Sequence, residues 1–387
     1  MSSEQFEHIR PYRDEEMQAV FARLLADRSF LDALLSFRYP RLARLAPGPM
    51  RALAAAWLRQ RTRRLRSIDD FQSSLEALFD HLIARTTRGF TWSGLDALDP
   101  ERPYLFVSNH RDIAMDSAFV NYATHADGFG TVRIAIGDNL LKKDFVTDLM
   151  RLNKSFVVQR SFSGPKDQLA AFRRTSAYLR HSIEQDRESV WIAQREGRAK
   201  DGDDRTDPAI LKMFFVSQRK SGRSFGEVLA DLHIVPVAVS YELDPCAPAK
   251  AQELRLRERD GDYEKPDDED LRSIVAGITG SKGRVHVHFG AELAAPAGNP
   301  EEVAADIDAA IHRGFRLWPT HLEAARRCGV EVPAALIEAA GEPDPATLQA
   351  FEAALAAAPA EDRPGILRQY ARPVRARIAA DACRDAA

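Results

Sequence analysis

Long hydrophobic runs are missing from this sequence of 387 residues. No stretch approaches the roughly 18 uninterrupted apolar residues that a membrane-spanning helix requires, so we expect no transmembrane segment. The first ten residues are polar and acidic, which is unlike a secretory signal. We therefore expect any membrane partner to be reached from the surface.

Cysteine is scarce. The three cysteines, Cys246, Cys328 and Cys383, lie far apart and away from histidines at metal-ligand spacing. This pattern predicts a reducing compartment and no structural zinc site. A strong charge imbalance is missing too, because the net charge is −3 at pH 7, and we expect no nucleic-acid partner.

Acidic residues are absent from one long segment, which holds nine arginines and no Asp or Glu between Ala33 and Ile68. Five of these arginines follow an apolar run that contains Trp57. A basic amphipathic helix with a tryptophan is typical of proteins that lie on an anionic bilayer. The alternative is a helix packed on the core with a solvated arginine face. We predict that residues 1–85 form a basic helical region at a membrane surface.

After Arg88, short β-rich runs alternate with helical stretches. The predicted strands are residues 89–92, 104–108, 132–136, 155–159, 189–193, 234–240 and 285–289. The predicted helices are residues 117–124, 143–151, 166–185, 212–222, 268–279 and 300–314. This alternation predicts an α/β fold, with a mostly parallel central sheet flanked by helices and with N-terminal and C-terminal helical additions. We expect one domain over residues 86–325 and a helical tail over residues 326–387.

A histidine lies where a predicted strand turns into a helix. The strand ends at Ser108, His110 follows, and Asp112 and Asp116 come within the next six residues. Active-site residues usually lie at this end of an open parallel sheet. A histidine beside a carboxylate can act as a general base on a substrate hydroxyl, with the carboxylate fixing its tautomer. A single His–Asp pair is nevertheless more often structural.

Three later segments carry further candidate chemistry. Arg160 ends a strand, where its guanidinium can bind a phosphate. Gly197 lets the backbone approach a ligand among basic neighbours. Residues 234–239 form an apolar run in which Pro236 must lie near the start of a strand or at a sheet edge. Each segment taken alone also fits a purely structural role.

Taken together, the four segments resemble the four sequence blocks of the glycerolipid acyltransferases, the family of 1-acylglycerol-3-phosphate and glycerol-3-phosphate acyltransferases. The matching residues are Asn109-His110 with Asp116, residues 156–160, Glu196-Gly197-Arg198 and Val235-Pro236-Val237. Their order and approximate spacing are those of the family, and the resemblance covers roughly residues 89–325. In that family the His and Asp of the first block, Asn-His-x4-Asp, are the catalytic pair.

Two departures from the family pattern concern the site. Asp116 lies six residues after His110, whereas the family's aspartate lies five residues after its histidine. Either Asp116 or Asp112 is therefore the partner of His110. The apolar run after Asp116 favours Asp116, which leaves Asp112 to cap the helix. In the third block the arginine comes one residue early, and Arg195 precedes Glu196.

The resemblance implies transfer of a fatty acyl group from acyl-CoA or acyl carrier protein to a lysophospholipid hydroxyl, that of 1-acylglycerol 3-phosphate first, in phospholipid synthesis. The implied catalytic residues are His110 and Asp116, and no metal or bound cofactor is required. The implied substrate-binding residues are Asn109, Arg160, Arg195, Glu196, Gly197 and Arg198. We expect a peripheral protein at the cytoplasmic face of the inner membrane, or one that is partly cytoplasmic. The alternatives are another acceptor, such as glycerol 3-phosphate or a lyso-aminolipid, and a non-catalytic lipid-binding relative.

Overall fold

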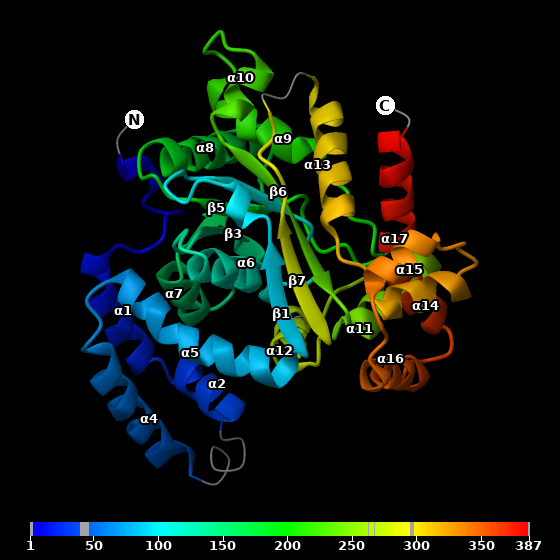
Figure 1. The fold of residues 1–387 in the computed structure, drawn as a ribbon. Helices are drawn as coiled ribbons and strands as arrows, with labels where there is room; N and C mark the ends of the chain where they lie inside the picture. Colours follow the sequence, from blue (N-terminus) through cyan, green and yellow to red (C-terminus); the bar gives the residue numbers. More distant parts are fainter. Residues whose placement is uncertain (1–2, 39–45, 262, 267, 295–297, 386–387) are drawn as a thin grey trace. The chain divides into compact units, whose positions relative to one another are not determined.

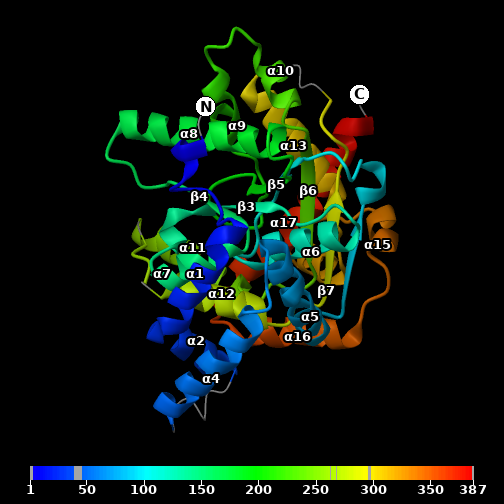
Figure 2. The same ribbon diagram turned by 90° about the vertical axis from the view of Figure 1, so that its left-hand side faces the viewer.

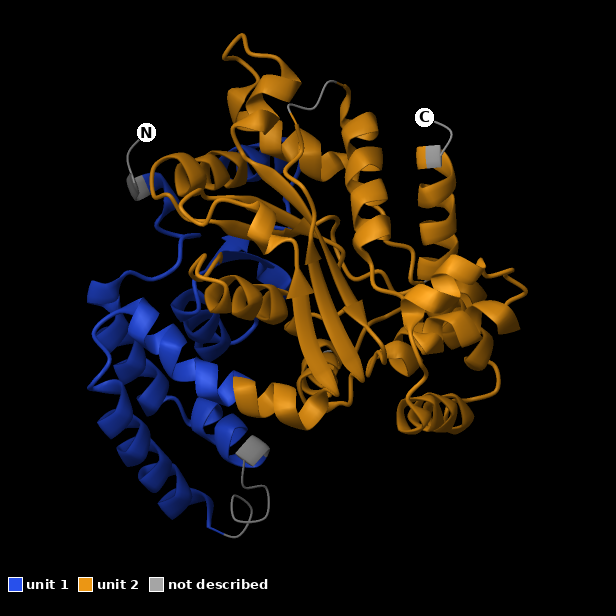
Figure 3. Cartoon of the chain, in the orientation of Figure 1, with its two compact units in different colours: residues 1–79, 133–174 blue, residues 80–132, 175–387 orange. Residues whose placement is uncertain are grey.

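The computed structural model describes residues 3–38, 46–261, 263–266, 268–294 and 298–385. The chain divides into two compact units, shown in Figure 3. Unit 1 comprises residues 1–79 and 133–174, and unit 2 comprises residues 80–132 and 175–387. In the described part of the chain, no helix is both long and apolar enough to span a membrane.

Unit 1 combines helices with one parallel strand pair (Figure 1). Its helices are α1 (Asp14–Ala26), α2 (Arg28–Arg38), α4 (Pro47–Thr62), α7 (Asp144–Leu152), most of α5 (Ile68–Thr86) and the first half of α8 (Pro165–Glu184). The strands are β3 (Arg133–Gly137) and β4 (Ser155–Val158). Apolar residues of α1 at helical spacing, Met17, Val20, Phe21 and Leu24, form the core of this unit with Ile68 and Leu152.

Unit 2 contains five strands in the order β1-β7-β6-β2-β5. They are β1 (Gly89–Ser93), β7 (Arg284–Phe289), β6 (Ile234–Tyr241), β2 (Leu105–Ser108) and β5 (Val190–Ala193). The paired strands run parallel, except β6 and β7, which lie side by side and antiparallel in Figures 1 and 2. Every residue of β2 and β6 is buried, as in sheets covered on both faces. The predicted mostly parallel α/β fold is confirmed.

The helices of unit 2 surround these strands and form the tail. They are α6 (Met115–Ala126), α9 (Pro208–Phe215), α10 (Phe225–Ala230), α11 (Ala247–Asp260), α12 (Glu269–Thr279), α13 (Pro300–Gly314), α14 (Pro319–Arg327), α15 (Ala334–Ala340), α16 (Pro345–Ala357) and α17 (Arg363–Asp385). The long C-terminal helix α17 packs against α14, α11 and α13 (Figure 1). The predicted C-terminal helices are therefore present, whereas the predicted domain boundaries at residues 85 and 325 stay predictions.

The strand predictions agree with the structure to within one residue at each end. Some of the helix predictions were wrong. The helix predicted over residues 212–222 begins at Pro208, because Asp207 caps it and proline suits the first helical position. It ends at Phe215. Helices α10 and α11 were not predicted.

Pro236 lies near the start of β6, which is one of its two predicted placements, and not at a sheet edge, because β6 pairs with β2 on one side and with β7 on the other. Its carbonyl accepts a hydrogen bond from the backbone N–H of Gly290, just beyond the end of β7. The N–H that proline lacks is thus missing only where the antiparallel ladder ends, and an interior strand tolerates it there.

Candidate active site

His110 lies in the turn between the carboxyl end of β2 and the start of α6. Its Nδ1 is 2.8 Å from Oδ2 of Asp116, which lies in the first turn of α6. The Asp116 side chain is fully buried, and the His110 side chain is 13% exposed. Since Nδ1 is bound to the aspartate, Nε2 is the ring nitrogen that can exchange a proton with a substrate.

Asp116 is held by four hydrogen bonds. Its Oδ2 also accepts from the backbone N–H groups of Arg111, at 2.6 Å, and Asp112, at 2.9 Å. Its Oδ1 accepts from the hydroxyl of Tyr241 at 2.7 Å. Burial alone would raise the pKa of the Asp116 carboxyl. The hydrogen bonds from His110 and Tyr241 outweigh burial, so this pKa lies below its usual value. The carboxylate is charged at neutral pH.

Asp112, the other candidate partner of His110, binds backbone N–H groups instead of the imidazole ring. Its Oδ1 accepts from the backbone N–H groups of Ala114 at 3.0 Å and Met115 at 2.9 Å, which is the bonding pattern of a helix cap. Burial and the nearby charge of Asp116 raise the pKa of the Asp112 carboxyl. The structure thus pairs His110 with Asp116 and leaves Asp112 to cap the start of α6.

Asn109 is fully buried, and its amide binds the neighbouring strand. Its Oδ1 accepts from the backbone N–H of Val239 at 2.7 Å, and its Nδ2 donates to the carbonyl of Val239 at 3.1 Å. The same Nδ2 lies 3.2 Å from Oδ2 of Asp204. The amide therefore fixes the His110 turn to β6, and its predicted contact with substrate stays a prediction.

The third block lies beside the His110 turn, because the backbone N–H of Ala199 donates to the His110 carbonyl at 2.8 Å. Arg198 is 8% exposed, its Nη2 lies 3.4 Å from Oγ of Ser273, and its Nη1 has no partner among the described residues. A buried guanidinium with an open N–H is suited to bind an anion. Gly197 has a φ of 75°, a conformation that favours glycine.

The remaining predicted residues are placed differently. Arg195 is partly exposed and Glu196 is exposed, both in the loop after β5. Arg160 belongs to unit 1, whereas the other predicted site residues belong to unit 2. It follows β4, and its backbone N–H donates to Asp138 at 3.2 Å. Binding of substrate by these three residues stays a prediction.

Sequence reasoning missed several residues that shape the turn. Tyr241 ends the strand of the fourth block, so its position beyond Pro236 was the one available signal. Arg111 is buried, and its guanidinium donates to Asp204 at 2.6 Å. Lys250 donates to the carbonyl of Arg111 at 2.6 Å. No sequence pattern pointed to Lys250, because it lies 139 positions from the turn that it contacts.

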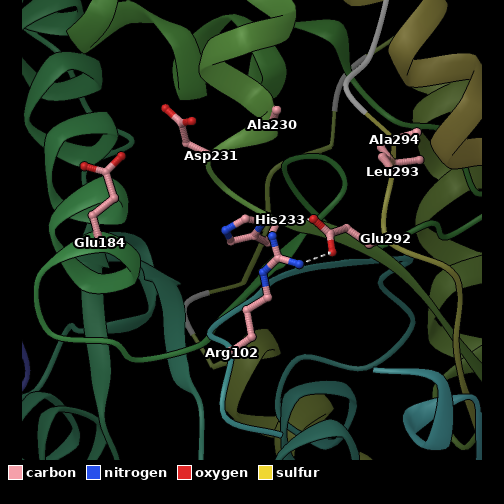
Figure 4. A pocket seen from close by; sticks show the side chains of 8 residues that line it. All are labelled: Arg102, Glu184, Ala230, Asp231, His233, Glu292, Leu293 and Ala294. Carbon is pink, nitrogen blue, oxygen red and sulfur yellow. Dashed lines mark hydrogen bonds and ion pairs between the residues drawn. The ribbon is translucent and has the colours of Figure 1, made fainter. Parts of the chain in front are cut away.

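Unit 2 also has a hollow of about 770 Å³, drawn in Figure 4. Its lining includes Arg102 and His233, which precede β2 and β6, whereas His110 follows the opposite end of β2. The charges in the hollow are paired: Glu292 binds His233 at 2.8 Å and Arg102 at 3.2 Å, and Asp231 binds Arg180 at 2.7 Å. The hollow is therefore separate from the His110 site.

One comparison with known proteins identifies a segment of the chain. Residues 89–240, which contain all the predicted site residues, match the family model described as Acyltransferase. No curated protein matches the sequence. Among solved structures, the chain is similar to the 1-acyl-sn-glycerophosphate (LPA) acyltransferase, PlsC, from Thermotoga maritima, with 13% identity over 74% of this chain and 96% of that chain. The TM-score is 0.39, so nothing about this chain's substrate follows from that similarity.

Proposed function

We propose that the chain, in which residues 89–240 match the Acyltransferase domain model, is a glycerolipid acyltransferase that transfers a fatty acyl group from acyl-CoA or acyl carrier protein to the hydroxyl of a lysophospholipid. The proposed acceptor is 1-acylglycerol 3-phosphate, in phospholipid synthesis. One observation carries the proposal. Within that domain, the buried, charged carboxylate of Asp116 holds Nδ1 of His110 at 2.8 Å and leaves Nε2 for the substrate.

The proposed mechanism uses His110 first as a base and then as an acid. Nε2 removes the proton of the acceptor hydroxyl, and the oxygen attacks the carbonyl carbon of the thioester. The tetrahedral intermediate collapses, the carbon–sulfur bond breaks, and the leaving thiolate takes the proton from Nε2. Asp116 keeps the imidazole in the required tautomer and stabilises the imidazolium between the two steps.

A phosphate on the acceptor would suit the basic residues beside the turn. Arg198 is buried within the loop that bonds to the His110 carbonyl, and its Nη1 is open. Desolvation strengthens a guanidinium–phosphate contact, so a phosphate there would be bound firmly and would orient the acceptor hydroxyl. We assign Arg195 a supporting contact with the same phosphate, and Glu196 the orientation of Arg195 and Arg198.

The basic helix α4 supports contact with a membrane surface. It buries only Ala55, and it exposes 65% of Leu53 and 55% of Trp57, which lie one helical turn apart. The guanidinium of Arg61 lies 5.1 Å from the centroid of the Trp57 ring. An exposed apolar pair flanked by arginines is typical of a helix that lies on an anionic bilayer. We propose this helix as the attachment to the cytoplasmic face of the inner membrane, measurable as binding to anionic vesicles.

Acyl transfer by the purified full chain tests the function. The donors are acyl-CoA and acyl carrier protein, and the acceptors are 1-acylglycerol 3-phosphate, glycerol 3-phosphate and a lyso-aminolipid. His110→Ala should lower the rate by about 10²–10⁴-fold, the usual contribution of a general base. The control is His125→Ala, in the last turn of α6, the helix that follows the His110 turn. Acyl transfer by His110→Ala at the wild-type rate would contradict the mechanism. Binding of lysolipid without transfer to any acceptor would favour the non-catalytic alternative.

A further inference from the structure

Arg111, the residue after His110, is fixed through both its backbone and its side chain. Its backbone N–H donates to Oδ2 of Asp116 at 2.6 Å, and its carbonyl accepts from Nζ of Lys250 at 2.6 Å. Its Nη2 donates to the carboxylate of Asp204 at 2.6 Å and to the carbonyl of Gly202 at 3.1 Å. Because Oδ2 of Asp116 also faces Nδ1 of His110, the position of the Arg111 backbone sets the geometry of the His–Asp pair.

One line of contacts leads from Arg111 back to the C-terminal helix α17. Lys250, on α11, forms an ion pair with the carboxylate of Asp244. The backbone N–H of Asp244 donates at 2.7 Å to the hydroxyl of Tyr370, on α17. A residue of the tail is thus connected to the His110 turn through Asp244 and Lys250.

A second line of contacts leads to the same helix. Gly202, whose carbonyl accepts from Arg111, lies directly against the backbone of Gln369, the neighbour of Tyr370. A Cβ at position 202 would collide with the Gln369 carbonyl, and the φ of Gly202 is 83°. The side chain of Gln369 also donates to the carbonyl of Ala247, at the start of α11, at 3.1 Å. Both lines therefore join α17 to Arg111.

The junction is closed to a substrate. Lys250 is 2% exposed and Tyr370 is 6% exposed. The cavity that Arg111, Tyr241 and Tyr370 help to line measures only about 20 Å³, which is room for about one water molecule. A buried ion pair seldom stabilises a protein more than apolar side chains of the same size would, and its best-attested benefit is a defined geometry. In the Lys250–Asp244 pair Lys250 is buried and the Asp244 side chain is 18% exposed, and the pair fits a positioning role better than it fits a contribution to stability.

We propose that helix α17 positions the His110–Asp116 pair for catalysis, acting through Lys250 on the backbone of Arg111. The inference rests on the proposed acyl transfer and adds to it that the C-terminal tail belongs to the catalytic unit. Lys250 and Tyr370 are positioning residues, because they act through Arg111 and touch no reacting atom.

The test compares two methionine substitutions on the same helix in the full chain. Lys250→Met removes the donor to the Arg111 carbonyl, so kcat should fall by about 10–100-fold with KM unchanged. Arg255→Met is the matched control. Arg255, also on α11, pairs at 2.6 Å with the buried Asp362, just before α17, and is not bonded to the His110 turn. The substitution Arg255→Met should therefore leave kcat at the wild-type value.

Tyr370→Phe provides a milder variant that keeps the ring packing and removes only the acceptor for the Asp244 N–H. We expect kcat to fall by about 3–10-fold, the effect of one hydrogen bond. Circular dichroism shows whether each variant is folded. The proposal would be overturned if folded Lys250→Met and Tyr370→Phe kept the wild-type kcat. A change in KM with no change in kcat would overturn it as well.

Nitrogen NMR of the histidine rings separates this proposal from the proposed function. The His110 signals are assigned by their loss in His110→Ala. They should shift in Lys250→Met and stay in place in Arg255→Met, whether or not the chain transfers acyl groups. An absence of acyl transfer with shifted signals would overturn the proposed function alone. Unchanged signals in Lys250→Met would overturn the positioning role.

Discussion

The imidazole of His110 can serve as a base only in one tautomer, which the acceptor on Nδ1 selects. That acceptor is Asp116, while Asp112 binds the first N–H groups of α6. Two aspartates four residues apart thus have separate tasks, because the turn aims only one of them at the ring. The sequence left this choice open, since either residue lies within reach of a histidine in a turn.

Substituting each aspartate by asparagine separates these tasks. Asp116→Asn removes the charge that stabilises the imidazolium, and we expect kcat to fall by about 10²–10⁴-fold. Asp112→Asn keeps an oxygen for the helix cap and removes a carboxylate whose pKa burial already raises, so kcat should change less than about threefold. Steady-state kinetics on both variants measure the difference. Equal losses would mean that the two carboxylates act together.

Tyr241 is the third member of a hydrogen-bonded chain that runs through Asp116 to His110. Tyr241→Phe should raise the pKa of the Asp116 carboxyl, because this hydrogen bond helps to lower it. It should also lower the free energy of unfolding by about 1.5–3 kcal/mol, the contribution of a hydrogen bond to a charged group. The pH dependence of kcat measures the first effect, and urea unfolding measures the second. In the control Tyr122→Phe, on α6, the lost hydroxyl donates to the carboxylate of Asp80 at 2.6 Å, and kcat should stay at the wild-type value.

At the scale of elements, helix α12 approaches the turn so closely that it needs a glycine. A Cβ on Gly277 would collide with the carboxylate of Asp112. Alanine in a helix normally stabilises it by about 1 kcal/mol relative to glycine. For Gly277→Ala we expect the opposite sign, a loss of about 1–3 kcal/mol from overpacking, together with a lower kcat. Gly48→Ala, where a Cβ meets open space in α4, is the control and should lack this overpacking loss in the same unfolding assay.

Helix α4 provides a test of membrane attachment. Replacing Leu53 and Trp57 together by serine removes the exposed apolar pair, so binding to anionic vesicles should weaken by at least tenfold. Ile337→Ser, on the exposed face of α15, is the control because it removes a similar apolar group outside the basic segment. Vesicle flotation compares the two variants, and equal binding by all forms would rule out this attachment.

Elements were predicted where local chemistry decides them. The strands are short apolar runs bounded by polar residues, and α13 begins at Pro300 with the cap that Asn299 and Glu302 form. The prediction for residues 212–222 failed because the capping signal of Asp207-Pro208 lies upstream of the apolar run that suggested a helix there.

At the scale of the whole molecule, buried histidines make stability depend on pH. Burial, together with the charge of Arg111, lowers the pKa of His321 to about 3. A histidine whose folded pKa is depressed stabilises the protein fully above its unfolded pKa of about 6.5, and this stabilisation is lost as the pH falls from there toward the folded value. Between pH 6.5 and pH 5 the loss is about 2 kcal/mol for such a group.

His321→Asn should therefore lower the number of protons taken up on unfolding by about one between pH 6.5 and pH 5. The free energy of unfolding then depends less steeply on pH in this range. Asparagine keeps an oxygen that can accept from the backbone N–H of Trp318, which donates to Nδ1 of the His321 ring at 3.1 Å. Urea titrations at the two pH values measure the slope, and His81→Asn, at an exposed position of α5, is the control. An unchanged slope in His321→Asn would contradict the burial argument.

The sequence by itself determined the mostly parallel α/β fold, the strands and the segments that carry the candidate chemistry, because apolar runs, caps and short motifs are local patterns. The tertiary structure alone decided that Asp116 faces His110, that Tyr241 completes the chain, and that Lys250 and α17 reach the turn. Those contacts include pairs that lie 125, 126 and 139 positions apart, and no local pattern encodes which distant side chain arrives at a given atom. Tertiary packing decides which distant side chain reaches the His110 turn.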